Sequence, residues 1–176
     1  MHATTDIDAT MSRLDSAINR LTAQRDCLAM ATSLIDGIDG PVLEIGLGNG
    51  RTYDHLRSLM PARRVFVFER QLAAHLDSTP PDADLLLGDL ADTLPRARER
   101  IRVPAALAHA DIGCGDEAVD RATAQLLSRW LPGLLAPAAI VLCDQSLDSP
   151  RLEPLSPPAS VAPDRYFCYR VTGDDE

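Results

Sequence analysis

The spacing of hydrophobic positions divides the chain into a helical first part and an alternating second part. In the segment from Asp8 to Ile35, apolar side chains recur at steps of three, four and seven residues, beginning with Leu14, Ile18 and Leu21. This spacing places them on one face of a helix. The segment therefore predicts one or two amphipathic amino-terminal helices, and Gly37 is a typical residue to end the last of them.

After this segment, short apolar runs alternate with longer runs of helical pattern. Nearly continuous apolar runs are typical of strands that are buried on both faces of a parallel sheet. Five such runs cover residues 41–46, 63–69, 83–89, 105–111 and 138–144. The runs between them predict helices over residues 52–60, 71–77, 90–101 and 117–131, the third of which is interrupted near Pro95. Alternating strands and helices predict a parallel sheet with helices on both faces and right-handed crossovers.

The carboxyl-terminal part of the chain has a different composition. Residues 146–164 are rich in proline and predict a surface loop, with a short strand at residues 151–153. Residues 165–172 alternate in polarity and predict a terminal strand. Together the runs predict an α/β fold with a Rossmann-like, doubly wound, mostly parallel sheet of about seven strands and amino-terminal helices. We expect one domain over residues 1–176, with a helical segment at 1–40 and a sheet core at 41–176.

Composition and charge exclude several classes of protein. No stretch approaches the roughly 20 consecutive apolar residues that cross a bilayer. The amino terminus has neither the basic region nor the apolar core of a signal peptide, so we expect a cytoplasmic protein. A net charge of −9 argues against a general surface for nucleic acid or for anionic membranes, since phosphate groups need clustered cations.

The cysteine pattern offers no metal site or disulfide framework. Cys27, Cys114, Cys143 and Cys168 form no C-x-x-C pair, and their spacing fits neither zinc fingers nor a set of disulfides. We interpret them as small buried side chains or free thiols.

The turn after the first predicted strand holds the main candidate site. The sequence there is VLEIGLGNGRTYDHL, with glycines at 46, 48 and 50. Open parallel sheets bind ligands beyond the carboxyl ends of their strands, and glycine lets a ligand approach the backbone closely. The alternative is a tight strand-to-helix turn without a ligand.

A dinucleotide is the obvious ligand to test against this turn. The dinucleotide motif is G-x-G-x-x-G, and here Arg51 stands at the third glycine position. Glu44 at the edge of the turn does not favour the pyrophosphate of a dinucleotide. A carboxylate there suits a ligand that carries positive charge.

The pattern E-x-G-x-G-x-G resembles the first motif of the class I S-adenosylmethionine-dependent methyltransferases. The resemblance extends to acids that end three further strands, Glu69, Asp89 and Asp111. The segments LTAQRDCLAMA, LEIGLGNGRTYDHLR and LAHADIGCGD are also similar to those of a small bacterial group of S-adenosyl-L-methionine methyltransferases. The resemblance implies S-adenosylmethionine as cofactor, with contacts from Glu44, Gly46, Leu47, Gly48, Asn49, Gly50, Tyr53, Glu69, Asp89, Leu90 and Asp111.

Within this set, the resemblance implies that Glu69 binds the ribose hydroxyls of the cofactor. A single carboxylate can accept one hydrogen bond from each of two neighbouring hydroxyls. It places Asp89 near the adenine, with Leu90 beside it. Each acid has an alternative role as a cap of the following helix. Asn49 and Tyr53 either contact the methionine part of the cofactor or simply begin the helix.

The residues that act on the methyl acceptor are harder to identify. His109 and Asp111 are the catalytic candidates, and the alternative for His109 is a packed histidine beside the sheet. Asp111, Asp144 and Gln145 are similar to the metal site of catechol-type O-methyltransferases. The similarity is incomplete, because Gln145 replaces an asparagine and the chain contains no lysine. The alternative is that these acids line the cofactor site or cap loops, so the metal is left open.

The sequence therefore predicts an S-adenosylmethionine-dependent methyltransferase that acts on an unidentified, small acceptor. We expect the amino-terminal helices to close over the cofactor or to mediate assembly into a homo-oligomer. One alternative is a non-catalytic protein that binds S-adenosylmethionine. Another is an NAD-dependent oxidoreductase, against which Arg51 and Glu44 both count.

Overall fold

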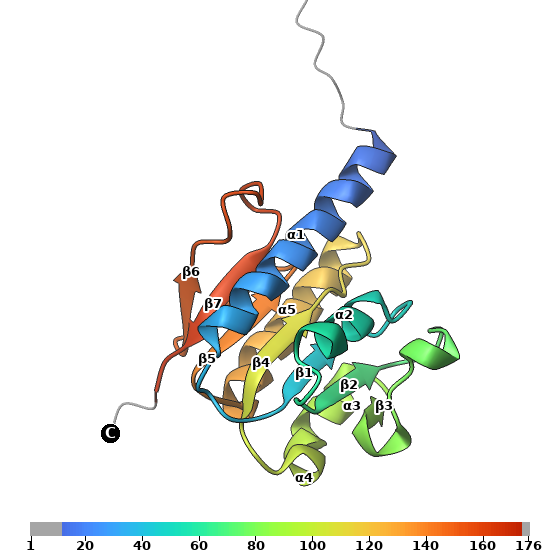
Figure 1. The fold of residues 1–176 in the computed structure, drawn as a ribbon, viewed down its shortest axis with the longest axis vertical. Helices are drawn as coiled ribbons and strands as arrows, with labels where there is room; N and C mark the ends of the chain where they lie inside the picture. The colour runs from blue at the N-terminus through green and yellow to red at the C-terminus, as the bar shows by residue number, and fades with distance from the viewer. Residues whose placement is uncertain (1–11, 174–176) are drawn as a thin grey trace, which may run out of the picture.

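The computed structural model describes residues 12–173, and the predicted start of the first helix at Asp8 lies outside this range. Helix α1, Arg13–Leu34, is capped by Ser12, whose side chain accepts a hydrogen bond from the Asp15 amide. Within the described residues the amino-terminal segment thus forms one helix. Its first half extends beyond the sheet (Figure 1).

Seven strands form one sheet. They are β1 Val42–Ile45, β2 Val65–Glu69, β3 Leu85–Leu87, β4 Ala105–Ala110, β5 Leu135–Cys143, β6 Leu152–Leu155 and β7 Phe167–Val171. Their order is β3-β2-β1-β4-β5-β7-β6. Strands β1 to β5 pair in parallel, and β7 runs antiparallel to both β5 and β6. The expected seven-stranded, mostly parallel sheet is confirmed, and the antiparallel pairs lie at its β6 edge.

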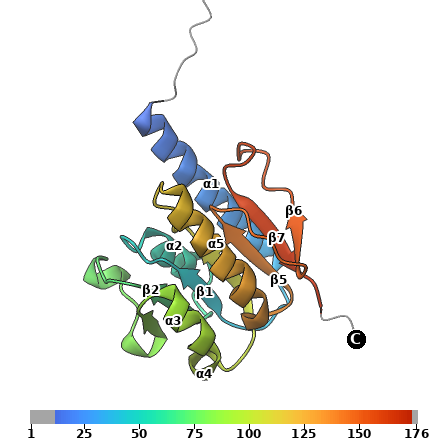
Figure 2. The same cartoon turned by 180° about the vertical axis from the view of Figure 1, so that it is seen from behind.

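Helices cover both faces of the sheet. Besides α1, the α-helices are α2 Arg51–Leu59, α3 Leu90–Thr93, α4 Ala97–Ile101 and α5 Glu117–Trp130. Buried side chains of α1 and α2 pack with Val42 and Val67 on one face. Buried side chains of α4 and α5 pack with Leu43 and Phe66 on the other. Figure 1 shows α1 and α2 in front of the sheet, and Figure 2 shows α3, α4 and α5 from behind. No helix of the described part is long and apolar enough to cross a membrane.

The predicted helix over residues 71–77 is wrong. These residues are all described, and they form an irregular segment with one 3₁₀ turn at Leu76–Ser78. The two leucines of this segment do not reach the core, since Leu76 is 87 % exposed and Leu72 is 42 % exposed. A helix this short needs a packed face to be stable. Farther along, Pro95 does interrupt the next helical run, which divides into α3, a 3₁₀ turn and α4.

Candidate functional site

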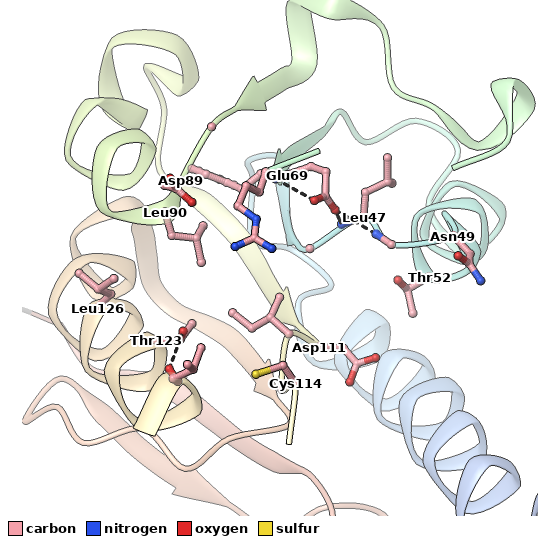
Figure 3. A pocket seen from close by; sticks show the side chains of 18 of the residues that line it. Leu47, Asn49, Thr52, Glu69, Asp89, Leu90, Asp111, Cys114, Thr123 and Leu126 are labelled. Atoms are coloured by element: carbon pink, nitrogen blue, oxygen red, sulfur yellow. Dashed lines mark hydrogen bonds between the residues drawn. The ribbon is translucent and has the colours of Figure 1, made fainter. Parts of the chain in front are cut away.

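A pocket of about 900 Å³ lies at the carboxyl ends of β1 to β4. Its wall is built from the turns that follow these four strands, from the first residues of α2 and α3, and from side chains of α1 and α5. Figure 3 shows Leu47 and Asn49 on one side, Asp89 and Leu90 on another, and Asp111 beside α1. The pocket is therefore where an open parallel sheet is expected to bind its ligand.

The glycine turn forms one wall of this pocket, and its conformation explains its composition. Gly46, Gly48 and Gly50 have φ angles of +86°, +51° and +79°, a region that other residues adopt only with strain. A Cβ at Gly50 would lie 2.7 Å from the carbonyl oxygen of Ser78. At Gly48 no atom lies within 4 Å of such a Cβ, so this glycine has an open face. Gly46 and Gly48 line the pocket, whereas Gly50 is the cap residue before α2 and does not.

Glu69 ties the end of β2 to the glycine turn. Its Oε2 accepts hydrogen bonds from the amides of Leu47 at 2.7 Å and Gly48 at 3.0 Å. Its Oε1 accepts from the amides of Arg70 at 2.7 Å and Gln71 at 3.1 Å. Partial burial opposes the charge, but these four donors outweigh burial and lower the pKa of the carboxyl group. Glu69 lines the pocket as a carboxylate and caps no helix.

Asp89 and Leu90 line the pocket on the β3 side. Asp89 stands at the cap position of α3, yet its side chain makes no capping hydrogen bond. Its carboxylate faces the pocket region instead, across from Thr123 and Leu126 of α5 (Figure 3). Asn49 also lines the pocket, whereas Tyr53 lies on the buried face of α2 and does not.

Asp111 is held from helix α1. Arg20 Nη1 lies 3.0 Å from Asp111 Oδ2, and Gln24 Nε2 donates to the same oxygen. Arg20, Leu21 and Gln24 all line the pocket, and sequence reasoning missed them as site residues. The available signal was a pair of polar residues, four apart, on the helix that was expected to close over the site.

Glu44 and His109 lie beneath the pocket, not on its wall. Both are fully buried, and Glu44 Oε2 is 2.7 Å from His109 Nδ1. The other oxygen of Glu44 accepts from the Thr52 hydroxyl, and the Tyr166 hydroxyl lies 2.5 Å from His109 Nε2. In this arrangement neither Glu44 nor His109 contacts a ligand in the pocket. The sequence did not reveal Tyr166 as their partner.

Of the two acids considered as metal ligands, Asp111 pairs with α1, and Asp144 holds the loop after β4. Asp144 accepts from the amides of Gly113 at 2.8 Å and Ile112 at 3.4 Å. Burial raises the pKa of this carboxyl group, while the two amides oppose that shift. Across residues 12–173, no three His, Cys, Asp or Glu side chains come together as a metal-binding group.

The pocket also fits the cofactor that the sequence motif implies. The open face of Gly48 allows a ligand close to the backbone, and Glu69 and Asp89 offer carboxylates at the ends of adjacent strands. These acids suit hydroxyl and amino donors.

Comparisons with known proteins identify the family of this chain. Residues 11–171 match the family model described as S-adenosyl-L-methionine methyltransferase. The crystal structure of an S-adenosyl-L-methionine methyl transferase from Silicibacter pomeroyi is 41 % identical in sequence. It superimposes with a TM-score of 0.85 over 92 % of this chain and 99 % of that chain.

More distant structures share the fold alone. An O-methyltransferase from Bacillus cereus, in complex with S-adenosylhomocysteine, is 16 % identical with a TM-score of 0.50, covering 94 % of this chain and 84 % of that chain. An O-methyltransferase family protein from Burkholderia thailandensis is 11 % identical with a TM-score of 0.51, covering 92 % and 60 % respectively. A comparison with curated proteins found no match. Because the family model spans nearly all of the described residues, the chain belongs to the S-adenosyl-L-methionine methyltransferase family and is an S-adenosylmethionine-dependent enzyme.

Proposed function

We propose that this methyltransferase acts on a small molecule that binds in the same pocket as the cofactor, between α1 and α5 and next to Asp111. The size and position of the pocket carry the proposal. Pockets for small ligands span roughly 300–1,000 Å³, and this one measures about 900 Å³. That volume suits a cofactor together with a small acceptor.

The two sides of the pocket wall differ in the chemical groups that they present. The glycine turn, Glu69 and Asp89 supply backbone groups and carboxylates on the side of β1 to β3. Helix α5 supplies apolar or weakly polar groups, Val119, Thr123 and Leu126, and α1 supplies Leu21 next to the polar Arg20 and Gln24. We assign the first side to the nucleoside part of the cofactor and the second to the acceptor.

The chemistry needs positioning more than it needs reactive side chains. When bound, the cofactor supplies a methyl group on a positively charged sulfur, which an acceptor atom attacks in line. The apolar groups of α1 and α5 would exclude water from the acceptor. Asp111 is the carboxylate placed to take a proton from an acceptor that carries one.

Parallel thermal-shift measurements on the full chain test the cofactor part of this proposal. A ligand at about a hundred times its Kd adds about 2.7 kcal/mol to the free energy of unfolding, and each kcal/mol raises Tm by roughly 2–4 °C in a chain of this size. We expect S-adenosylmethionine and S-adenosylhomocysteine to raise Tm and NAD not to do so. Glu69→Ala should weaken binding by about 1–3 kcal/mol, while Glu153→Ala, at the far edge of the sheet on β6, should not. A shift with NAD alone would contradict the assignment.

The acceptor part needs a different assay. Release of S-adenosylhomocysteine would be followed while the enzyme is given separated low-mass and macromolecular fractions of a cell extract. We expect turnover with the low-mass fraction. Turnover with the macromolecular fraction alone would overturn the proposal of a small acceptor. Assembly into a homo-oligomer and a cytoplasmic location stay predictions.

A further inference from the structure

Two buried thiols meet where helix α1 packs on strand β7. The Sγ atoms of Cys27 on α1 and Cys168 on β7 lie 3.9 Å apart, although the residues are 141 positions apart in the sequence. Cys27 is fully buried, Cys168 is 2 % exposed, and both are free thiols. Neither residue lines the pocket. Binding of a ligand there therefore does not explain why the two sulfur atoms are in contact.

The contact makes the two thiols chemically unequal. Their shared hydrogen bond raises the pKa of Cys27 and lowers the pKa of Cys168, while burial raises both. When Cys168 is ionised, the Cys27 thiol is the donor that stabilises its negative charge. The thiolate is the nucleophilic form of cysteine. Cys168 is therefore the sulfur of this pair that reacts first with an oxidant.

The other two cysteines are in different surroundings. Burial raises the pKa of Cys143, and the neighbouring Asp144 carboxylate adds to that shift. A buried thiol of this kind is unreactive. Cys114 is exposed on the pocket wall, and within the described residues no second thiol contacts it. These two cysteines serve as internal controls for the reactivity of the α1–β7 pair.

The loop between β6 and β7, residues 156–166, packs beside this pair. It runs alongside α1 (Figure 1, Figure 2). Its residues Val161 and Tyr166 belong to the same buried cluster as the two thiols. Ser160 Oγ donates at 2.6 Å to the carboxylate of Asp26, the residue that precedes the α1 thiol. Because this bond lies at an exposed position, local opening of the loop would admit a small oxidant to the pair.

We propose that Cys27 and Cys168 form a site of reversible oxidation, at which hydrogen peroxide converts the two thiols to a disulfide that fastens α1 to β7. The Cys168 thiolate attacks one peroxide oxygen and becomes a sulfenic acid, and the O–O bond breaks. The hydroxide that leaves takes up a proton and departs as water. The Cys27 thiol loses its proton, and its sulfur displaces hydroxide from the sulfenic sulfur, which releases a second water. Two thiols are thus oxidised while one peroxide is reduced to two waters.

The disulfide would act on the wall of the pocket. A disulfide has an S–S distance of about 2.0 Å, so the two sulfur atoms approach each other by about 2 Å. Gln24, which lies one turn before Cys27 on α1, lines the pocket together with Arg20 and Leu21. Oxidation would therefore anchor the helix that carries these side chains. In a reducing compartment such a disulfide is transient and reports the presence of an oxidant.

Mass spectrometry of the peroxide-treated full chain tests this site. After treatment, the remaining thiols are blocked with iodoacetamide and the protein is digested with trypsin in the absence of reductant. We expect a cross-linked product that joins residues 26–51 to residues 166–170, each of which contains a single cysteine. The product should disappear with dithiothreitol. We also expect oxidation to raise Tm by roughly 4–16 °C, which dithiothreitol should reverse.

A pair of serine variants tests the role of the loop. Ser160→Ala should speed formation of the disulfide by roughly 2–10-fold, since loss of one typical hydrogen bond increases the open population by that factor. Ser156→Ala is the matched control, because Ser156 is an exposed residue of the same loop, and its rate should stay unchanged. Equal rates for the two variants would mean that the loop does not control access.

Three results would overturn the proposal. Oxidation confined to Cys114 would show that the buried pair does not react in the folded protein. A cross-link that forms only in urea would assign the disulfide to the unfolded chain. A cross-link that forms in the folded protein without a rise in Tm would mean that it does not fasten α1 to the sheet.

Discussion

At the scale of single residues, the buried pair of Glu44 and His109 is the most consequential feature beneath the site. Burial lowers the pKa of His109, but the Glu44 carboxylate on β1 outweighs burial, and Asp111 and Asp144 act in the same direction. The net effect is a raised pKa. Tyr166, before β7, occupies the other ring nitrogen, and burial raises the pKa of its hydroxyl well above the usual range. His109 therefore links strands β1 and β4 to the approach of β7, and it keeps its positive charge to a higher pH than an ordinary histidine does.

This pair predicts a pH dependence of stability. Because the pKa of His109 is raised on folding, its contribution is complete below the ordinary value of 6.5 and is lost as pH rises through the raised value. Breaking a buried pair costs about 3–5 kcal/mol. We expect His109→Gln to lower the free energy of unfolding by that amount at pH 6, and by less at higher pH.

Urea denaturation over a pH series measures this difference. The matched control is His75→Gln, since His75 is exposed and pairs only with the exposed Asp77. That variant should differ little from the unmodified protein at every pH. A gap between His109→Gln and the unmodified protein that grows with pH would contradict the charged state of His109.

At the scale of elements, the turn between β1 and α2 combines two demands. Its backbone must adopt positive φ angles, and its amides at Leu47 and Gly48 must reach the Glu69 carboxylate. Gly50 adds a third demand, because the irregular segment at Ser78 packs directly against it. The turn is thus fixed by β2 and by residues 70–78 as well as by its own glycines.

Alanine substitutions separate these demands. The left-handed conformation costs about 1–2 kcal/mol for a residue with a Cβ, and overpacking adds about 1–3 kcal/mol. We expect Gly50→Ala to lose about 2–5 kcal/mol of stability and Gly48→Ala only about 1–2 kcal/mol. Gly48→Ala should also weaken binding of S-adenosylhomocysteine, since Gly48 lines the pocket.

Gly37→Ala is the control for strain alone. Gly37 has a φ of +82° with no atom within 4 Å of an added Cβ, and it lies outside the pocket. Its stability loss should match that of Gly48→Ala, while cofactor affinity stays unchanged. Denaturation and calorimetry on the same samples give both quantities. Equal cofactor affinities for these two variants would mean that the open face of Gly48 does not serve the ligand.

At the scale of the whole molecule, helix α1 connects parts that are far apart in sequence. Arg165 donates to the carbonyl of Ser16 at 2.8 Å, and Ser160 donates to Asp26 at 2.6 Å. These contacts bring the carboxyl-terminal loop onto the helix that also holds Asp111. We therefore expect the stability of α1 to affect the shape of the pocket.

That coupling predicts how the molecule unfolds. Leu28 lies on the buried face of α1, and Leu28→Ala should cost about 2–5 kcal/mol. Leu14→Ala should change stability by no more than about 0.5 kcal/mol, because Leu14 is 69 % exposed. The single tryptophan, Trp130, packs with the core on the opposite face of the sheet. In Leu28→Ala, the midpoint of unfolding followed by tryptophan fluorescence should shift together with the midpoint followed by circular dichroism. Separate midpoints would mean that α1 unfolds on its own.

Several features could be predicted because they depend on local sequence. Each buried parallel strand is a nearly continuous apolar run, and parallel strands place their carboxyl ends at one edge. The positions of the glycine turn, Glu69, Asp89 and Asp111 follow from that geometry. Residues 71–77 differ, since their apolar pattern favoured a helix but Leu72 and Leu76 lie exposed, away from the core.

The sequence by itself thus determined the sheet, the edge at which the pocket lies and the backbone chemistry of its glycine turn, all of which arise from neighbours along the chain. The tertiary structure alone decided that Glu44 is buried against His109 and that Arg20 of α1 reaches Asp111. These pairs are 65 and 91 residues apart. Their contacts depend on how strands pair and how a helix crosses the sheet. Hydrophobic periodicity specifies which face of a helix is buried, but not which side chain at its rim meets an acid on a distant strand.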